Sequence, residues 1–128
     1  MNNWKVFNPN PTKNRVGDCT IRAISKALNQ DWETTYAALS AYGFSLCDMP
    51  NANWVWGMYL EDKGFQQYII DHHGKRIYTV NDFCEDNPKG TYLLAIDGHV
   101  VCVVDGKYYD SWDSGAEIPI YYWTKRGT

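Results

Sequence analysis

A chain of 128 residues with 45% hydrophobic and 21% charged residues fits one globular domain with a hydrophobic core of its own. The formal charge of −3, without any run of Lys or Arg, argues against binding nucleic acid through the phosphate backbone. No apolar stretch approaches the roughly 18 residues of a transmembrane helix, and the first residues lack the apolar region of a signal peptide, so we expect a cytoplasmic protein with no membrane partner.

The four cysteines are expected to be reduced thiols, as is usual inside cells. None of them belongs to a Cys-x-x-Cys pair, and the adjacent His72 and His73 stand in a polar turn without further ligands. The sequence therefore predicts no metal site and implies no organic cofactor.

The first half of the chain reads as an arm followed by helices. Residues 1–17, which contain two prolines, are expected to form an extended arm and loop. A helical pattern begins at about Asp18, a favourable N-cap residue, with Ile24 on its apolar face and Arg22 and Ser25 on its outward face.

Two further helices and a strand-rich half follow. One helix is expected from Asp31 to a stop at Gly43, and another after Pro50 that ends at Lys63 and Gly64. β-Branched and aromatic residues predict strands at 65–70, 91–96, 99–104, 107–112 and 118–123, with a short helix at 80–84. The chain is therefore predicted to be a single α+β domain, residues 1–128, with N-terminal helices packed on a C-terminal antiparallel sheet.

The pair Asp105-Gly106 predicts a tight hairpin turn, and this turn sets the register of the strands on either side. In that register His99 lies opposite Trp112 and diagonal to Asp110, which places the carboxylate within reach of a side-chain contact with the histidine. Asp113 falls on the other face. A carboxylate beside a histidine fixes its tautomer and stabilises the imidazolium, and Trp112 is placed to shield this pair from water.

Cys19 supplies a candidate nucleophile at the start of the first predicted helix. The helix dipole and the free backbone N–H groups at a helix N-terminus favour a thiolate there. The same N–H groups are suited to bind a developing oxyanion. Cys19, His99 and Asp110 together are therefore predicted to be catalytic, although a cysteine at a helix start and a His–Asp pair each also occur as structural features.

Three segments resemble papain-like cysteine peptidases. They are Gly17-Asp18-Cys19 before a helix, Gly98-His99-Val100-Val101 on a strand, and Asp110-Ser111-Trp112, in which Asp stands where the family often has Asn. The order Cys, His, Asp is also that of the family, and compact bacterial or phage members such as bacteriocin-processing peptidases are similar in size. The resemblance implies a papain-like fold and cleavage of a peptide or isopeptide bond in a peptide or protein substrate. In that reading Cys19 forms a thioester, His99 is the base and Asp110 orients the histidine.

The resemblance is incomplete before the nucleophile. The family carries a Gln there that donates to the oxyanion, whereas this chain has Lys13, Asn14 and Arg15, of which Asn14 is the amide that could substitute. Two alternatives therefore stay open beside the peptidase. One is an acyl transferase with the same triad, and the other is a binding module that keeps a papain-like fold without turnover.

Overall fold

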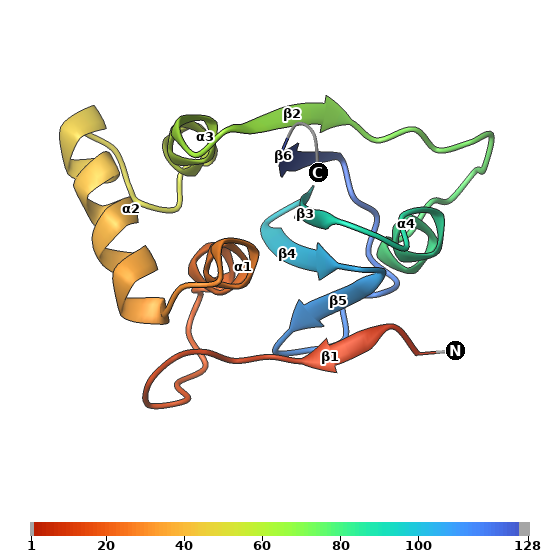
Figure 1. The fold of residues 1–128 in the computed structure, drawn as a ribbon, viewed down its shortest axis with the longest axis horizontal. Coiled ribbons are helices and arrows are strands. Elements are labelled where there is room, and N and C mark those ends of the chain that lie inside the picture. Colours follow the sequence, from red (N-terminus) through yellow and green to blue (C-terminus); the bar gives the residue numbers. More distant parts are fainter. Residues whose placement is uncertain (1, 126–128) are drawn as a thin grey trace.

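The computed structural model describes residues 2–125, which form four helices and six strands (Figure 1). The helices are α1 (Cys19–Leu28), α2 (Trp32–Leu46), α3 (Asn53–Asp62) and α4 (Val80–Asp86). The strands are β1 (Trp4–Val6), β2 (Phe65–Ile69), β3 (Thr91–Ile96), β4 (His99–Val104), β5 (Lys107–Asp110) and β6 (Tyr121–Lys125). The predicted α+β class, with helices dominating the first half, is confirmed.

All six strands belong to one sheet in the order β1-β5-β4-β3-β6-β2. Four of the neighbouring pairs are antiparallel, but β1 runs parallel to β5, with Trp4 beside Tyr108 and Val6 beside Asp110. The prediction of a purely C-terminal antiparallel sheet is therefore wrong at this edge. The predicted arm, residues 1–17, contains a strand that pairs with a segment far along the chain.

Helices cover both faces of the sheet. Figure 1 shows α1, with α2 and α3 beyond it, on one side of the strands and α4 on the other. Val100 and Cys102 of β4 belong to the apolar core on the α1 side, while Val101 and Val103 belong to the core on the α4 side. Successive residues of a strand point to opposite faces, which explains why β4 is almost continuously hydrophobic.

Two helix boundaries show how local signals succeed and fail. Asp31 caps α2 as predicted, since its side chain accepts a hydrogen bond of 2.7 Å from the N–H of Thr34. Gly43 does not end the helix, which continues to Leu46 and ends with Cys47 in the left-handed conformation. Gly43 is instead a point of close approach, because a Cβ there would lie 2.7 Å from the backbone oxygen of Asp48.

The outward face predicted for α1 is wrong at two positions. Ser25 is buried and donates a hydrogen bond of 2.8 Å to Thr35 of α2. Arg22 is also buried, among acidic groups described below. Both side chains find polar partners in other segments, although Nε of Arg22 is buried without a hydrogen bond within the described residues.

The strand ends next to the hairpin differ from the prediction by a few residues. β5 ends at Asp110, not at residue 112, and the N–H of Ser111 just beyond it donates a 2.8 Å hydrogen bond to the Asp110 side chain and not to a neighbouring strand. β6 begins at Tyr121, not at residue 118. α4 begins after Thr79, whose side chain and that of Asp82 form a capping box.

Candidate active site

Cys19 is the first residue of α1, and the residue before it does not cap the helix in the usual way. The carboxylate of Asp18 accepts no hydrogen bond from the backbone N–H groups at the start of α1. It is held instead by the guanidinium of Arg22 and by the indole N–H of Trp32, at 2.9 Å. The first N–H groups of α1 therefore have no side-chain cap, and the thiol of Cys19 lies at the positive end of the helix.

His99 and Asp110 meet at one end of the β4–β5 hairpin. The predicted register is confirmed, with Val103 opposite Tyr108 on either side of a turn whose residues 105 and 106 both have positive φ. The Nε2 atom of His99 lies 2.6 Å from Oδ2 of Asp110. Nδ1 is therefore the ring nitrogen left to exchange a proton with Cys19.

Asp110 is held from several sides and is 1% exposed. Besides His99, its carboxylate accepts hydrogen bonds from the hydroxyl of Ser114 at 2.7 Å and the N–H of Ser111 at 2.8 Å. Its backbone oxygen accepts from the N–H of Phe7 at 2.9 Å and the indole of Trp4 at 3.1 Å. A carboxylate bonded in this way has little freedom to leave the histidine.

Asp113, the neighbouring carboxylate that the predicted register excludes, contacts a different group. Its Oδ1 accepts hydrogen bonds from the hydroxyl of Tyr108 and from the N–H of Gly115. Tyr108 is buried in the core on the α4 side. Asp110 is therefore the acid that contacts His99, and Asp113 is a structural neighbour.

Arg22 joins the nucleophile helix to the acid of the hairpin, and the sequence analysis missed it. One amino group of its guanidinium pairs with Asp18, and the other lies 3.2 Å from Oδ1 of Asp110, a residue 88 positions away in the chain. The side chains of all three residues are less than a tenth exposed. The i, i+4 spacing of Asp18 and Arg22 was the one sequence signal that could have pointed to this pair.

The titration of the three groups favours an ion pair. Burial raises the pKa of the Cys19 thiol, but the hydrogen bonds with His99 and the N–H of Val100 outweigh it, so the pKa lies below its ordinary value. Burial lowers the pKa of His99, whereas its bonds to Asp110 and Cys19 raise it to about 9. Burial raises the pKa of Asp110, and the bonds from His99 and Ser114 bring it below its usual range. The lowered pKa of Cys19 and the raised pKa of His99 both favour the thiolate–imidazolium form of the pair.

The other three cysteines lie in different environments. Burial raises the pKa of the Cys84 thiol to about 12 and also raises that of Cys102. Cys47 is exposed at the end of α2. Cys19 is thus the one thiol of the four whose surroundings favour the reactive form.

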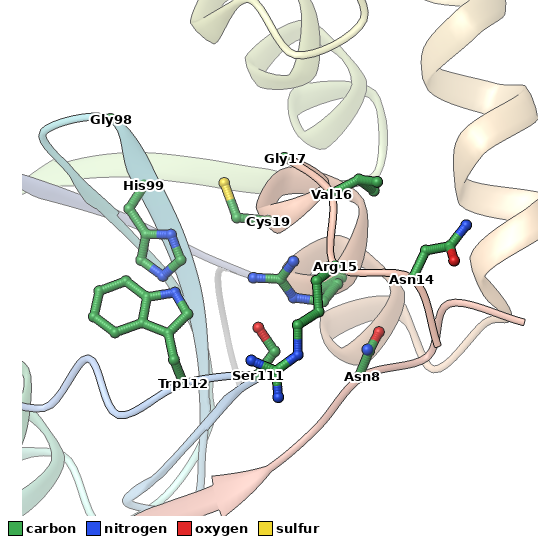
Figure 2. Close-up of a pocket in the computed structure, with 11 residues that line it drawn as sticks. Asn8, Asn14, Arg15, Val16, Gly17, Cys19, Gly98, His99, Ser111 and Trp112 are labelled. Carbon is green, nitrogen blue, oxygen red and sulfur yellow. The ribbon is translucent and has the colours of Figure 1, made fainter. Parts of the chain in front are cut away.

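A pocket of about 330 Å³ opens over Cys19. Figure 2 shows its walls, with His99 and Trp112 on one side of the sulfur and the loop before α1 on the other. The lining residues are Asn8, Asn14, Arg15, Val16, Gly17, Cys19, Arg22, Gly98, His99, Ser111 and Trp112. An acyl group could therefore reach the thiol, the imidazole and the start of α1 from the same pocket.

Two further predicted site residues lie at this pocket. The ring of Trp112 lies 4.8 Å from that of His99, between centroids, and covers one side of the imidazole. Trp112 is 42% exposed, so it is a wall of the pocket and not a core residue. Asn14 also lines the pocket, but Figure 2 shows its amide directed away from Cys19, and a role for Asn14 as oxyanion donor stays a prediction.

Within residues 2–125, no three His, Cys, Asp or Glu side chains are grouped in a way that could hold a metal ion. His73 of the His72-His73 pair lies 3.8 Å from Asp86 and 3.7 Å from Asp71.

None of the helices within residues 2–125 combines the length and apolar character that crossing a bilayer requires.

The structure brings together Cys19, His99, Asp110 and Trp112, which the sequence separates by up to 93 positions (112 minus 19). Comparison of the chain with protein-family models, with curated proteins and with solved structures finds no match.

Proposed function

We propose that this protein is a cysteine hydrolase that cleaves a peptide or isopeptide bond through a thioester on Cys19. The observation that carries the proposal is the set of contacts among Cys19, His99 and Asp110. The thiol is at the start of a helix, the imidazole bonds to both neighbours, and the carboxylate is buried and fixed. These are the roles of nucleophile, base and orienting acid in a catalytic triad.

The reaction follows from these positions. The thiolate of Cys19 attacks the carbonyl carbon, and a C–S bond forms as the carbonyl oxygen becomes negative. The protonated His99 then gives its proton to the leaving amine as the C–N bond breaks. Water enters, His99 takes one of its protons, and the hydroxide attacks the thioester to release the carboxylic acid and the thiolate. Asp110 holds the imidazole in place through both steps.

The oxyanion needs hydrogen-bond donors next to the sulfur. The first N–H groups of α1 meet this need, because Asp18 turns its carboxylate toward Arg22 and Trp32 and leaves these groups without a cap. Two or three such donors, aimed at developing negative charge, are what an oxyanion site requires.

The experiment that tests the proposal is acylation with p-nitrophenyl acetate, a small reactive ester. We expect a burst of nitrophenolate and an acetyl group on Cys19, located by mass spectrometry of the digested protein. His99→Ala should slow the burst by about tenfold or more, because the thiol loses the partner that lowers its pKa. Cys47 is exposed and serves as the internal control for ordinary thiol reactivity.

A second measurement identifies the molecule, water or an amine, that accepts the acyl group from Cys19. Incubation with a mixture of proteome-derived peptides should generate new termini in the presence of wild-type protein and not of Cys19→Ala. If an acetyl-Cys19 intermediate forms but passes to an added amine in preference to water, the protein is an acyl transferase. If Cys19 is acylated no faster than Cys47, the proposal fails and a binding module without turnover becomes the better description.

A further inference from the structure

A second pocket, of about 320 Å³, lies beside the first, between the N-terminal part of α2, the loop before α1 and the segment around Pro50. We call it the α1–α2 pocket. Its lining residues are Asn10, Asn14, Val16, Gly17, Asp18, Ile21, Trp32, Tyr36, Ser40, Pro50 and Asn51. Five of these are apolar or aromatic, and they form one concave surface, which is the usual composition of a side-chain binding site.

The aromatic wall of the α1–α2 pocket is fixed in position. The rings of Trp32 and Tyr36 stack with centroids 5.0 Å apart. The indole N–H of Trp32 donates to Asp18, which sets the orientation of the ring. Tyr36 remains 49% exposed and Val16 55% exposed, so apolar surface stays in contact with water. A ligand that covered this surface would gain the free energy of removing it from water.

The charges around the α1–α2 pocket favour a neutral apolar occupant. The one acidic side chain in its wall is Asp18, and both carboxylate oxygens are already bonded, one to Arg22 and the other to Trp32. Among residues 2–125, no basic side chain lines the pocket. A charged group entering it would lose water without gaining a partner.

The position of the α1–α2 pocket relative to Cys19 indicates which part of a substrate would enter it. The two pockets share Asn14, Val16 and Gly17, and Figure 2 shows these residues leading away from Cys19 on the side opposite to His99 and Trp112. The leaving amine must lie next to the histidine that protonates it. The acyl part, which stays on the sulfur, therefore extends toward Gly17 and Val16.

From this arrangement we infer that the α1–α2 pocket binds a large apolar side chain, aromatic or leucine-like, on the acyl side of the bond that is cleaved. The inference rests on the proposed function, because it identifies the acyl side from the roles of Cys19 and His99. It assigns substrate selection to Trp32 and Tyr36 of α2, which lie outside the triad.

The test uses p-nitrophenyl esters of four acetylated tripeptides. One has three glycines, and each of the other three has a phenylalanine at a different position. The rate of the nitrophenolate burst is divided by the rate of the same ester with mercaptoethanol, which removes differences in intrinsic reactivity. We expect at least one phenylalanine ester to acylate Cys19 about tenfold faster than the glycine ester.

Two variants locate the source of the preference. Tyr36→Asp places a charge in the α1–α2 pocket at a half-exposed position, where folding tolerates it. We expect this variant to lose the phenylalanine preference to within twofold, where the preference is the ratio of the phenylalanine rate to the glycine rate measured on the same variant. Phe44→Asp is the matched control, because Phe44 is on the same helix, is 88% exposed and does not line the pocket. It should keep the preference.

The outcomes separate the inference from the proposed function. If no ester acylates Cys19, the proposed function itself is wrong. If all four esters acylate it at equal normalised rates, the function stands and the inference is overturned. A preference that survives in Tyr36→Asp also overturns it, since selection then comes from another part of the protein.

Discussion

Replacing Arg22 should strongly destabilise the protein, because Arg22 is a buried cation between two buried carboxylates. In Arg22→Met the volume of the side chain is largely kept, but Asp18 and Asp110 lose their shared cation. Asp110 retains its hydrogen bonds from His99, Ser111 and Ser114. Asp18 retains only the indole of Trp32, so it carries the larger part of the loss.

The magnitude follows from the burial of these groups. The side chains of Asp18 and Asp110 are 4% and 1% exposed, so water cannot replace the guanidinium. Removing one partner of a buried ion pair costs about 3–5 kcal/mol. Because both carboxylates keep other donors, we expect a loss near 3 kcal/mol in the free energy of unfolding at pH 7, which corresponds to a fall in Tm of about 10 °C.

The assay is urea unfolding followed by tryptophan fluorescence, at pH 7 and pH 4.5. The difference between wild type and Arg22→Met should shrink at the lower pH, because the unpaired carboxylates of the variant can take up protons and become neutral. Arg76→Met is the control, since Arg76 is exposed. The double variant Asp18→Asn with Arg22→Met should recover part of the loss.

The reasoning is refuted if Arg22→Met loses less than about 1 kcal/mol, the range of an exposed pair. It is also refuted if the double variant is no more stable than Arg22→Met. In that case the unpaired carboxylate of Asp18 would not be the source of the loss.

Three other predictions concern the reaction. Cys19→Ala should abolish the nitrophenolate burst with p-nitrophenyl acetate and change the free energy of unfolding by less than about 1 kcal/mol; a burst of wild-type size and rate in Cys19→Ala would contradict the triad. Asp110→Ala should lower peptide cleavage about 100-fold or more, whereas Asp113→Ala, which removes the hydrogen bonds from Tyr108 and Gly115 but none to His99, should lower it less than about tenfold; the reverse order, measured as kcat/KM, would rule out Asp110 as the orienting acid. Cleavage should rise with pH as Cys19 ionises and fall above about pH 9 as His99 loses its proton; a pH profile still rising at pH 10 would exclude the ion pair.

The raised pKa of His99 also determines how the free energy of unfolding depends on pH. Its pKa is raised in the folded state, so the stabilisation from its ion pairs is fully present below the pKa of an unfolded histidine, about 6.5, and is lost as the pH rises through about 9. Asp110 has the opposite sign, because its pKa is lowered. The stability it contributes is present at neutral pH and is lost as the pH falls below its unfolded pKa.

The features that could be predicted from the sequence are those set by short-range chemistry. The contact between His99 and Asp110 follows from a two-residue turn, because a turn of known type fixes which residues of its strands are neighbours. The N-cap at Asp31 and the start of α1 at Cys19 are equally local. Each of these needs no knowledge of the rest of the fold.

The features that could not be predicted depend on distant partners. β1 has three residues, and nothing in them indicates that they pair with β5 more than 100 positions away. Arg22 looks like a solvent-facing residue of an amphipathic helix, and only Asp110, 88 positions further on, makes it an interior residue. The uncapped start of α1 is likewise visible only once Arg22 and Trp32 are seen to hold Asp18.

The order of strands also affects how the protein acquires its reactivity during synthesis. β6 follows all the other elements of residues 2–125 in the chain, yet it lies between β3 and β2 in the sheet. Until β6 has been made, β2 has no neighbour in the sheet, and the apolar core on the α1 side lacks Trp123. A ribosome-bound chain that ends before β4 also carries Cys19 without His99 and Asp110. Its thiol then lacks the partner that lowers its pKa, so the reactive form of Cys19 is favoured only once the hairpin has folded.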